Sequence, residues 1–278
     1  IESDDAVNAY LRVKNLNDAE YVNSHYVVFC TKNGIIKKTS LEQYSRPRQN
    51  GVNAILIRED DRVIEVRMTD GSNEIIMANR NGRAIRFNEA TVRAMGRTAT
   101  GVRGMQLDDD GKDEVVGMVC IKDPEKETIM VVSEQGYGKR SDIEDYRKTN
   151  RGGKGVKTIN ITEKTGKLVT IKSVTDDNDL MIITLRLKLS NVRVMGRATQ
   201  GVRLINLEKR NDEIGSVCKV TTDEEAESII EEATQQSLEF KDYDDQPSNS
   251  LIPTDEDADD MPNNIPDSQE NPDENNEE

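Results

Sequence analysis

The sequence predicts an all-β protein built as a propeller-like ring of four-stranded blades, about five in this chain, followed by a disordered acidic tail. Three observations predict this arrangement. A glycine–valine pair recurs about every fifty residues, and the intervals contain short runs of alternating apolar residues. The third observation is a change in charge near residue 220, where a slightly basic segment gives way to a strongly acidic one.

Three sequence markers recur in the same order along residues 1–220. A hairpin-type glycine comes first, then the glycine–valine pair, then a polar turn that leads into an alternating run. The markers are Gly34, Gly82 and Gly136, then Gly51-Val52, Gly101-Val102, Gly155-Val156 and Gly201-Val202, then Asp60–Arg67, Lys112–Val119, Thr165–Lys172 and Asn211–Cys218. A turn-and-run segment at Asp4–Leu11 indicates the end of an earlier unit, so we expect the N-terminal blade to be truncated.

The second unit shows the four strands of one blade most clearly. We expect them at Glu74–Ala78, Arg83–Asn88, Val102–Leu107 and Glu114–Ile121. The runs are rich in Val, Ile and Met, alternate with period two and are bounded by Gly, Asn and Asp, as is typical of strands. Asn81-Gly82 predicts a tight hairpin in which both turn residues have positive φ. One such sheet cannot bury both of its faces alone, but neighbouring sheets can cover them.

The fourth unit departs from this pattern. Leu185-Arg186 matches Ile85-Arg86, and Ile183-Thr184 matches Met77-Ala78, but nothing matches the hairpin turn between them. Two strands joined without a turn cannot form a tight hairpin, so we expect a defective blade around the Thr184–Leu185 junction.

Residues 221–278 form the predicted tail. They contain one basic residue, Lys241, and none of the 18 glycines. Thr222–Glu225 has the form of a capping box and could start a short helix. Beyond Phe240 the segment has too few apolar residues to offset the loss of chain entropy, so we expect disorder. The tethered acid could compete with phosphate groups for the lysines and arginines of residues 1–220, or it could act only as a solubilising tail.

Lysine and arginine residues cluster between the hairpin glycine and the glycine–valine pair of every unit. If each blade places this loop on the same side, the loops form one basic belt, which is the electrostatic footprint of nucleic-acid binding. Any one of these residues could be an ordinary solvated side chain, but their recurrence at the same phase of the repeat favours the belt. The candidate DNA-binding residues are Lys37, Lys38, Arg46, Arg48, Arg83, Arg86, Arg93, Arg97, Arg103, Lys139, Arg140, Arg147, Lys148, Arg151, Lys154, Lys157, Arg186, Lys188, Arg193, Arg197 and Arg203.

The composition favours double-stranded DNA as the partner. Aromatic residues make up 4% of the chain and Trp is absent, which argues against modules that stack single strands or RNA on aromatic rings. Contacts should go mainly to phosphates and should therefore tolerate any base sequence. The stretch Thr149–Gly155, with Arg151 and Lys154, favours a phosphate-facing loop over a chance glycine-rich connection, although it lacks the Gly-Lys-Ser/Thr order of a P-loop.

We expect no catalytic residue, metal site or cofactor in this part of the protein. The single histidine, His25, leaves no room for a Ser-His-Asp triad or a histidine-rich metal site. Cys30, Cys120 and Cys218 are far apart and sit in apolar runs, which predicts buried free thiols. No run is apolar and long enough to span a membrane, and no signal peptide is evident, so we expect a cytoplasmic protein without a membrane partner.

The repeated basic loops, the acidic tail and the phrase Val-Arg-Val-Met-Gly-Arg-Ala-Thr-Gln-Gly-Val-Arg at Val192–Arg203 resemble the C-terminal domain of the DNA gyrase A protein family, which belongs to the type IIA topoisomerases. The resemblance covers about residues 1–220. It implies a β-pinwheel whose blades exchange strands and whose basic rim wraps double-stranded DNA. It also implies a non-catalytic domain that presents a DNA segment to the gyrase core for ATP-dependent negative supercoiling.

The same resemblance implies the partners. They are the rest of the gyrase A protein, together with the gyrase B protein, in an A2B2 holoenzyme that is nucleoid-associated in the cytoplasm. The catalytic tyrosine and the use of ATP and Mg lie outside this domain. The family's gyrase box, Gln-Arg-Arg-Gly-Gly-x-Gly, belongs to the first blade, which would lie upstream of Ile1. Asn150–Gly155 resembles the box but lies in a later blade and lacks the Gln-Arg start.

Other classes of protein remain open at this point. The equivalent domain of topoisomerase IV typically has fewer and more degenerate blades. A propeller that binds chromatin or other proteins, such as the regulator of chromosome condensation, predicts apolar or aromatic patches on one face rather than a basic rim. A propeller enzyme would need His or carboxylates that converge at one phase of the repeat, and none do. The regular units and the acidic tail favour gyrase.

Overall fold

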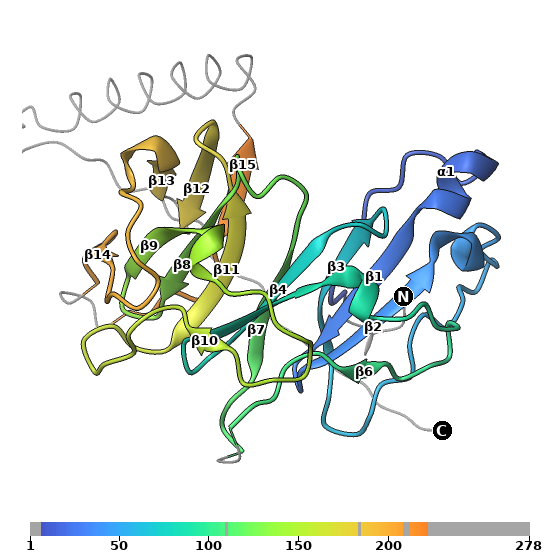
Figure 1. The fold of residues 1–278 in the computed structure, drawn as a ribbon, viewed down its shortest axis with the longest axis horizontal. Coiled ribbons are helices and arrows are strands. Elements are labelled where there is room, and N and C mark those ends of the chain that lie inside the picture. The colour runs from blue at the N-terminus through green and yellow to red at the C-terminus, as the bar shows by residue number, and fades with distance from the viewer. Residues whose placement is uncertain (1–6, 109–110, 183–184, 208–211, 222–278) are drawn as a thin grey trace, which may run out of the picture. The chain divides into compact units, whose positions relative to one another are not determined.

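Antiparallel sheets follow one another along the chain (Figure 1). The computed structural model describes residues 7–108, 111–182, 185–207 and 212–221, all within one compact unit, Ile1–Glu224. In spatial order, the first sheet contains β3 (Val63–Thr69), β1 (Tyr26–Thr31), β2 (Ile35–Ser40) and β6 (Val102–Arg103), and the second contains β10 (Val156–Lys157), β5 (Arg83–Asn88), β4 (Glu74–Asn79) and β7 (Val115–Ile121). The third sheet contains β11 (Leu168–Val174), β8 (Thr128–Ser133), β9 (Tyr137–Asp142) and β14 (Val202–Arg203). The fourth contains β13 (Leu185–Lys188), β12 (Asn178–Ile182) and β15 (Cys218–Thr221).

Helices are short in the described residues. The α-helix α1 (Ala19–Ser24) precedes the first sheet, and Asp18 caps it by accepting a hydrogen bond from the N–H of Tyr21. A short 3-10 turn follows the second strand of each sheet. These turns are η1 (Leu41–Tyr44), η2 (Glu89–Thr91), η3 (Ile143–Asp145) and η4 (Leu189–Asn191). The predicted all-β class is confirmed.

Each four-stranded sheet is completed by a strand from the next unit of the repeat. The glycine–valine strand β6 pairs with β2, and Val102 lies opposite Ile36. β10 and β14 pair in the same way with β5 and β9. The assignment of Val102–Leu107 to the second blade is therefore wrong, because only Val102–Arg103 is strand and it belongs to the first sheet. The exchange of strands between blades, implied by the family resemblance, is present.

The hairpin glycines serve both the turn and the packing above it. Gly82 has a φ of +77°, and its N–H donates to the carbonyl oxygen of Asn79 at 3.0 Å, which closes a three-residue loop. Asn81 does not have a positive φ, so the predicted two-residue turn is wrong. A Cβ at Gly82 would lie 2.9 Å from the carbonyl oxygen of Ile159, because the chain of the next unit passes directly over the turn.

The hydrophobic cores lie between consecutive sheets. In β4, Ile75 and Met77 belong to a buried cluster with Val28 of the first sheet, whereas Ile76 belongs to a cluster with Ile129 of the third sheet. Alternate side chains of a strand point to opposite faces, so this strand is buried on both sides. Burial of both faces by neighbouring sheets is the arrangement that the sequence predicted.

Four sheets are present in the described residues, where the sequence predicted about five units. Residues 7–11 contain no strand, so the predicted end of an earlier unit is not seen as a blade. In the fourth unit, β12 and β13 do pair, with Ile182 opposite Leu185, so the expectation of no hairpin is wrong. Ile182 takes the place of Met77 in the register, and the link to Leu185 is shorter than in the other sheets. The predicted tail beyond Thr221 lies outside the described residues.

Candidate nucleic-acid interface

Three loops, 93–101, 147–155 and 193–201, leave the sheets in the same way, and we call them the basic loops. Each begins beside the second strand of the preceding sheet through a backbone hydrogen bond of 2.8–2.9 Å. The N–H donors and carbonyl acceptors are Met95 and Lys38, Thr149 and Arg86, and Met195 and Arg140. Each loop ends at the glycine–valine strand that pairs with that same second strand. Both ends of a loop are therefore anchored to one strand.

Consecutive units are also joined at the basic loops. In each loop, the carbonyl two residues before the last glycine accepts a hydrogen bond from an N–H of the preceding unit. The donors and acceptors are Leu56 and Ala99 at 3.3 Å, Gln106 and Gly153 at 3.0 Å, and Asn160 and Thr199 at 3.1 Å. The three loops thus occupy equivalent places at three successive junctions.

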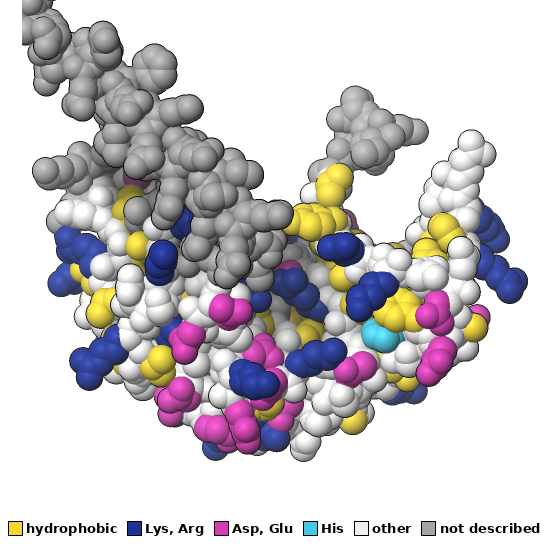
Figure 2. Space-filling model, turned by 90° about the horizontal axis from the view of Figure 1, so that it is seen from above, with side chains coloured by type: hydrophobic (Ala, Val, Ile, Leu, Met, Phe, Trp, Pro, Cys, Tyr) yellow, Lys and Arg dark blue, Asp and Glu magenta, His cyan; other side chains and the backbone are white. Residues whose placement is uncertain are grey.

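The predicted DNA-binding residues differ in exposure. The exposed ones are Arg46, Arg48, Arg93, Arg103, Arg147, Lys148, Lys154, Lys157, Lys188, Arg193 and Arg203. Half-buried are Arg83, Arg97, Arg151, Arg186 and Arg197. Buried are Lys37, Lys38, Arg86, Lys139 and Arg140. On the face drawn in Figure 2, Lys and Arg side chains stand at both sides and in the middle, while Asp and Glu gather along the lower edge. Exposed cations without a carboxylate partner among the described residues, such as Arg93 and Arg193, can meet a phosphate without rearrangement of the protein, whereas the buried cations cannot.

The buried arginines hold the 3-10 turn of the next unit. Arg86 is 2% exposed, and its Nη1 donates to the carbonyl oxygens of Ile143 at 2.8 Å and Tyr146 at 3.0 Å. Its Nε donates to Glu74 at 2.5 Å. Burial alone would raise the pKa of Glu74, but hydrogen bonds from Lys148 and Arg86 hold it below its usual value. Arg86 therefore acts as a bridge between the second and third sheets.

Arg140 and Lys38 occupy the same register position as Arg86 and make equivalent bridges. Arg140 Nη1 donates to the carbonyl oxygen of Leu189 at 2.9 Å, and Lys38 Nζ donates to that of Glu89 at 3.2 Å. Each acceptor is in the 3-10 turn of the following unit. These three cations lie inside strands and not in the loops. That difference in position was the sequence signal that could have excluded them from the DNA-binding set.

Two buried lysines sit beneath the basic loops. Lys37 Nζ donates to the carbonyl oxygens of Ala54 at 2.6 Å and Arg97 at 2.8 Å, and Lys139 Nζ donates to that of Gly196 at 2.6 Å. Burial lowers the pKa of Lys37 to about 8, with a smaller contribution from the nearby charge of Arg97. Burial also lowers the pKa of Lys139 to about 8, against the opposing effect of Asp145. These ammonium groups bind loop carbonyls and are not presented at the surface.

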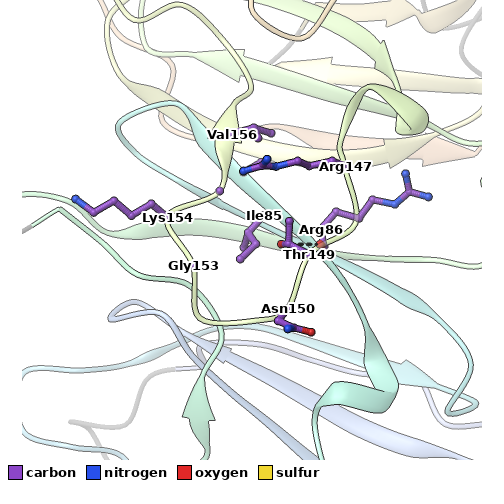
Figure 3. A pocket seen from close by; sticks show the side chains of 10 residues that line it. Ile85, Arg86, Arg147, Thr149, Asn150, Gly153, Lys154 and Val156 are labelled. Carbon is purple, nitrogen blue, oxygen red and sulfur yellow. Dashed lines mark hydrogen bonds between the residues drawn. The ribbon is translucent and has the colours of Figure 1, made fainter.

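The glycine-rich loop at 147–155 arches over a cavity of about 280 Å³ (Figure 3). Arg147, Asn150 and Lys154 line this cavity together with backbone of the second sheet. Gly155 has a φ of +73°, and a Cβ there would lie 2.3 Å from the carbonyl oxygen of Ala84. Glycine is therefore required where the loop rejoins the sheet, and exposed cations border the hollow that results.

A second cavity lies between the first unit and the loop 93–101. Its volume is about 480 Å³, and Arg46, Arg48 and Arg97 are among the residues that line it. Three guanidinium groups around one hollow make a cationic recess large enough for an anion.

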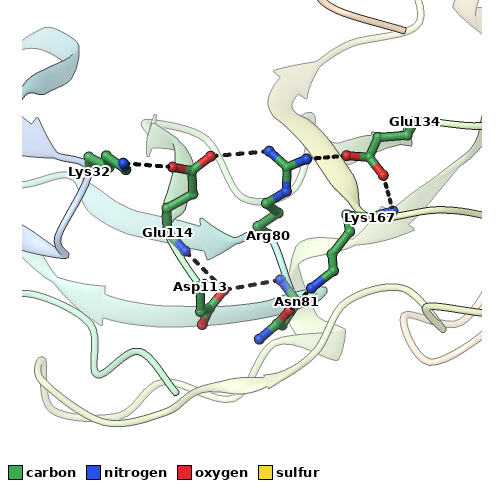
Figure 4. A network of polar contacts seen from close by, with 7 residues as sticks. All are labelled: Lys32, Arg80, Asn81, Asp113, Glu114, Glu134 and Lys167. Carbon is green, nitrogen blue, oxygen red and sulfur yellow. Dashed lines mark hydrogen bonds and ion pairs between the residues drawn. The ribbon is translucent and has the colours of Figure 1, made fainter. Parts of the chain in front are cut away.

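A different set of charges joins the hairpin turns (Figure 4). Glu114 pairs with Lys32 at 3.4 Å and with Arg80 at 3.2 Å, and Arg80 also pairs with Glu134 of the third unit. Asp113 accepts hydrogen bonds from the N–H groups of Asn81 and of Glu114. Cations at these turns are neutralised by neighbouring carboxylates, whereas exposed Arg93 and Arg193 of the basic loops form no ion pair with a described residue. Lys148 and Lys154 of the loop 147–155 do pair, with Glu74 and with Asp108, so cations without a described carboxylate partner, such as Arg93 and Arg193, are found in the loops 93–101 and 193–201.

The repeat of sheets and basic loops is also the unit that a known family profile recognises. The profile described as DNA gyrase C-terminal domain, beta-propeller, matches residues 25–70, 73–122, 127–175 and 183–217, one stretch for each unit of the sequence repeat. The chain belongs to the DNA gyrase C-terminal domain family. The four matched stretches follow the period that the glycine markers define.

Relatives and solved structures agree with this assignment. The A subunit of DNA gyrase from Staphylococcus aureus is 42% identical over 203 residues, which is 71% of this chain and 22% of the relative. The chain therefore spans about a fifth of the length of that relative. The C-terminal domain of DNA topoisomerase IV superposes with a TM-score of 0.66 at 28% identity, over 71% of this chain and 62% of that one. A DNA gyrase A C-terminal domain gives 0.62 at 26% identity, over 71% and 66%.

Metal-binding clusters and membrane spans are both missing from the part of the chain that the structure describes. No group of three or more His, Cys, Asp or Glu residues in that part could hold a metal ion, and no helix in it is long and apolar enough to cross a membrane. Cys30 is buried, Cys120 is half-buried and Cys218 is exposed, so the predicted burial of Cys218 is wrong. Burial raises the pKa of Cys120 to about 12, which leaves its thiol protonated and unreactive at neutral pH.

Proposed function

We propose that this chain binds and wraps double-stranded DNA through the exposed cations of the basic loops, largely without regard to sequence. The observation that carries the proposal is the repetition of one exposed basic loop at three equivalent junctions between sheets. A duplex that follows the loops would meet a similar set of cations at each step. Its phosphates repeat regularly whatever the base sequence, so the interaction would be sequence-tolerant and sensitive to salt.

Within a longer gyrase A protein, the wrapped DNA would present a segment to the enzyme core for ATP-dependent negative supercoiling. We propose the rest of that protein, together with the gyrase B protein, as partners in an A2B2 holoenzyme. This holoenzyme would be cytoplasmic and associated with the nucleoid. ATP and Mg would be used elsewhere in that holoenzyme. Membership of the DNA gyrase C-terminal domain family and the similarity to the staphylococcal gyrase relative support this proposal.

The test measures the affinity for duplex DNA across a salt series with the full 278-residue chain. If about six to ten phosphates are contacted, the slope of log K against log salt concentration should be roughly −5 to −9. The double variant R93E/R193E reverses two exposed loop cations and should flatten the slope by about 2, equally for unrelated sequences. K122E/K126E makes the same charge change between β7 and β8, outside the basic loops, and is the matched control.

Equal affinity losses in R93E/R193E and K122E/K126E would mean that net charge, and not the loops, sets the binding. A loss confined to one DNA sequence would point to base reading and would contradict the proposal.

A second candidate is the same role in topoisomerase IV. The similarity to the C-terminal domain of DNA topoisomerase IV, with its TM-score of 0.66, supports this second candidate. The discriminating measurement is the reaction of the complete enzyme on relaxed circles and on linked circles. Introduction of negative supercoils supports the gyrase assignment, and efficient unlinking without supercoiling supports the alternative.

A further inference from the structure

Two of the loop arginines bind the neighbouring unit rather than standing free. Arg197 Nε donates to the carbonyl oxygen of Asp145 at 2.9 Å, and its Nη1 donates to that of Lys157 at 2.8 Å. Arg151 Nε donates to the carbonyl oxygen of Thr91 at 3.1 Å, and its Nη1 donates to that of Arg103 at 3.0 Å. Each guanidinium thus closes two hydrogen bonds onto the unit before its own.

The two pairs of bonds are equivalent by position in the repeat. Arg151 and Arg197 each lie four residues before the glycine of the glycine–valine pair. In both cases one acceptor lies at the end of the preceding 3-10 turn and the other lies in the preceding glycine–valine strand. The same contact at two junctions indicates a property of the repeat and not a chance surface contact.

The first junction is built differently. Arg97 stands at the same position of its loop, but its guanidinium forms no hydrogen bond or ion pair with a described residue. The buried Lys37 does join these two units by donating to the carbonyl oxygens of Ala54 and Arg97. Lys139 makes an equivalent bond to Gly196 at the junction that Arg197 also bridges, so the difference lies in the arginine. Arg97 and Arg197 therefore sit in nearly identical phrases, Met-Gly-Arg, yet have different surroundings.

We propose that Arg151 and Arg197 are positioning residues that fix the spacing of adjacent basic loops, while Arg97 remains available to DNA. This inference rests on the proposed function for its consequence but not for its geometry. A guanidinium offers two donors in a planar fork that an ammonium cannot reproduce, although both carry the same charge. Replacement by lysine therefore removes the two-point contact and keeps the attraction for phosphate.

Loop spacing matters because DNA that contacts several units must bend to follow them. The energy of bending is offset only if successive loops meet successive phosphate groups along the curved duplex. A short duplex that reaches one loop does not depend on the distance between loops. Duplex length thus separates the positioning role from a direct phosphate contact.

The first measurement is amide hydrogen exchange without DNA, on the full 278-residue chain. In R197K, exchange of the Asn160 amide, which donates to Thr199, should accelerate about threefold or more, since the bonds beside it are lost. R97K is the matched control and should leave the equivalent Leu56 amide unchanged. R151K repeats the test at the Gln106 amide, so that the failure of one variant to fold does not decide the question.

The second measurement is affinity for duplexes of about 10 and about 40 base pairs, lengths of roughly 34 Å and 136 Å. In R151K and R197K, affinity for the long duplex should fall about fivefold or more, while affinity for the short one stays within about twofold. Because Arg97 is available to DNA, any loss of affinity in R97K should be the same factor for both duplexes.

Three outcomes are informative. If R197K behaves like R97K in hydrogen exchange, the positioning role is overturned. If exchange accelerates but affinity for the long duplex is unchanged, loop spacing does not govern DNA binding and the proposal is also overturned. If the wild-type chain binds neither duplex, the proposed function fails, and the exchange data alone then decide whether Arg151 and Arg197 hold the loops.

Discussion

Replacement of the buried Arg86 by methionine should destabilise the protein without removing a DNA contact. The change removes the guanidinium donor from the carbonyl oxygens of Ile143 and Tyr146; that of Ile143 still accepts from the Tyr146 N–H, whereas an unpaired buried acceptor costs about 1–3 kcal/mol. Glu74 also loses one of its two cationic partners, although Lys148 remains. The ion pair with Glu144 adds little, because the Glu144 side chain is 79% exposed. We therefore expect the free energy of unfolding to fall by about 3–5 kcal/mol.

Urea unfolding followed by circular dichroism measures this loss, and a thermal melt should show a fall in Tm of roughly 6–20 °C. R83M is the matched control, because Arg83 is half-buried in the same strand and donates one bond of 3.2 Å, to Gly155. It should lose less than about 1.5 kcal/mol. At a temperature where both variants are folded, R86M should bind DNA within about twofold of the wild type. A loss of stability below about 1 kcal/mol, or a flatter salt dependence of DNA binding, would refute the assignment of Arg86 as a bridge between sheets.

Two further predictions concern the backbone and the buried lysines. G155A should lower the free energy of unfolding by at least about 3 kcal/mol, because the added Cβ meets the backbone of Ala84. G51A is the control: Gly51 has a similar φ of +75° but nothing within 4 Å of an added Cβ, so the loss should be about 1 kcal/mol. Equal losses in urea titrations would show that contact with Ala84 is unimportant. Lys37 and Lys139 have a folded pKa of about 8, below the ordinary value of 10.5, so the unfolded chain binds more protons between those two values. The unfolding free energy of the wild type, measured relative to that of K37M/K139M, should therefore rise as the pH increases from about 8 to 10.5, and a flat difference would contradict the burial of these ammonium groups.

The period of the fold could be read from the sequence because glycine marks turns with positive φ, several of which also leave no room for a Cβ. Gly82 and Gly155 are forced by close backbone contacts, so the repeat retains them at fixed intervals. The strands β4, β5 and β7 were visible as alternating runs for the same local reason. Strand partners are not local, and the exchange of Val102–Arg103 into the first sheet depends on tertiary packing that a single unit does not reveal.

The candidate site was predictable at the level of loops but not of individual cations. Arg93 and Arg193 were expected to be exposed, and they are. Arg86 and Lys139 carry the same charge in the same part of the repeat, yet they are buried because carbonyl oxygens of the next unit bind them. The sequence contains no direct sign of those acceptors, since they lie more than fifty residues away along the chain.

The exchange of strands delays the completion of each sheet during synthesis of the protein. The first sheet has three of its strands once Thr69 has been made, but its fourth strand arrives only with Val102–Arg103, roughly thirty residues later. At translation rates of about 5–20 residues per second, each sheet would wait on the order of seconds with the edge of its second strand open. Folding on the ribosome would then be sequential, because each new unit supplies the strand that completes the sheet of the unit made before it.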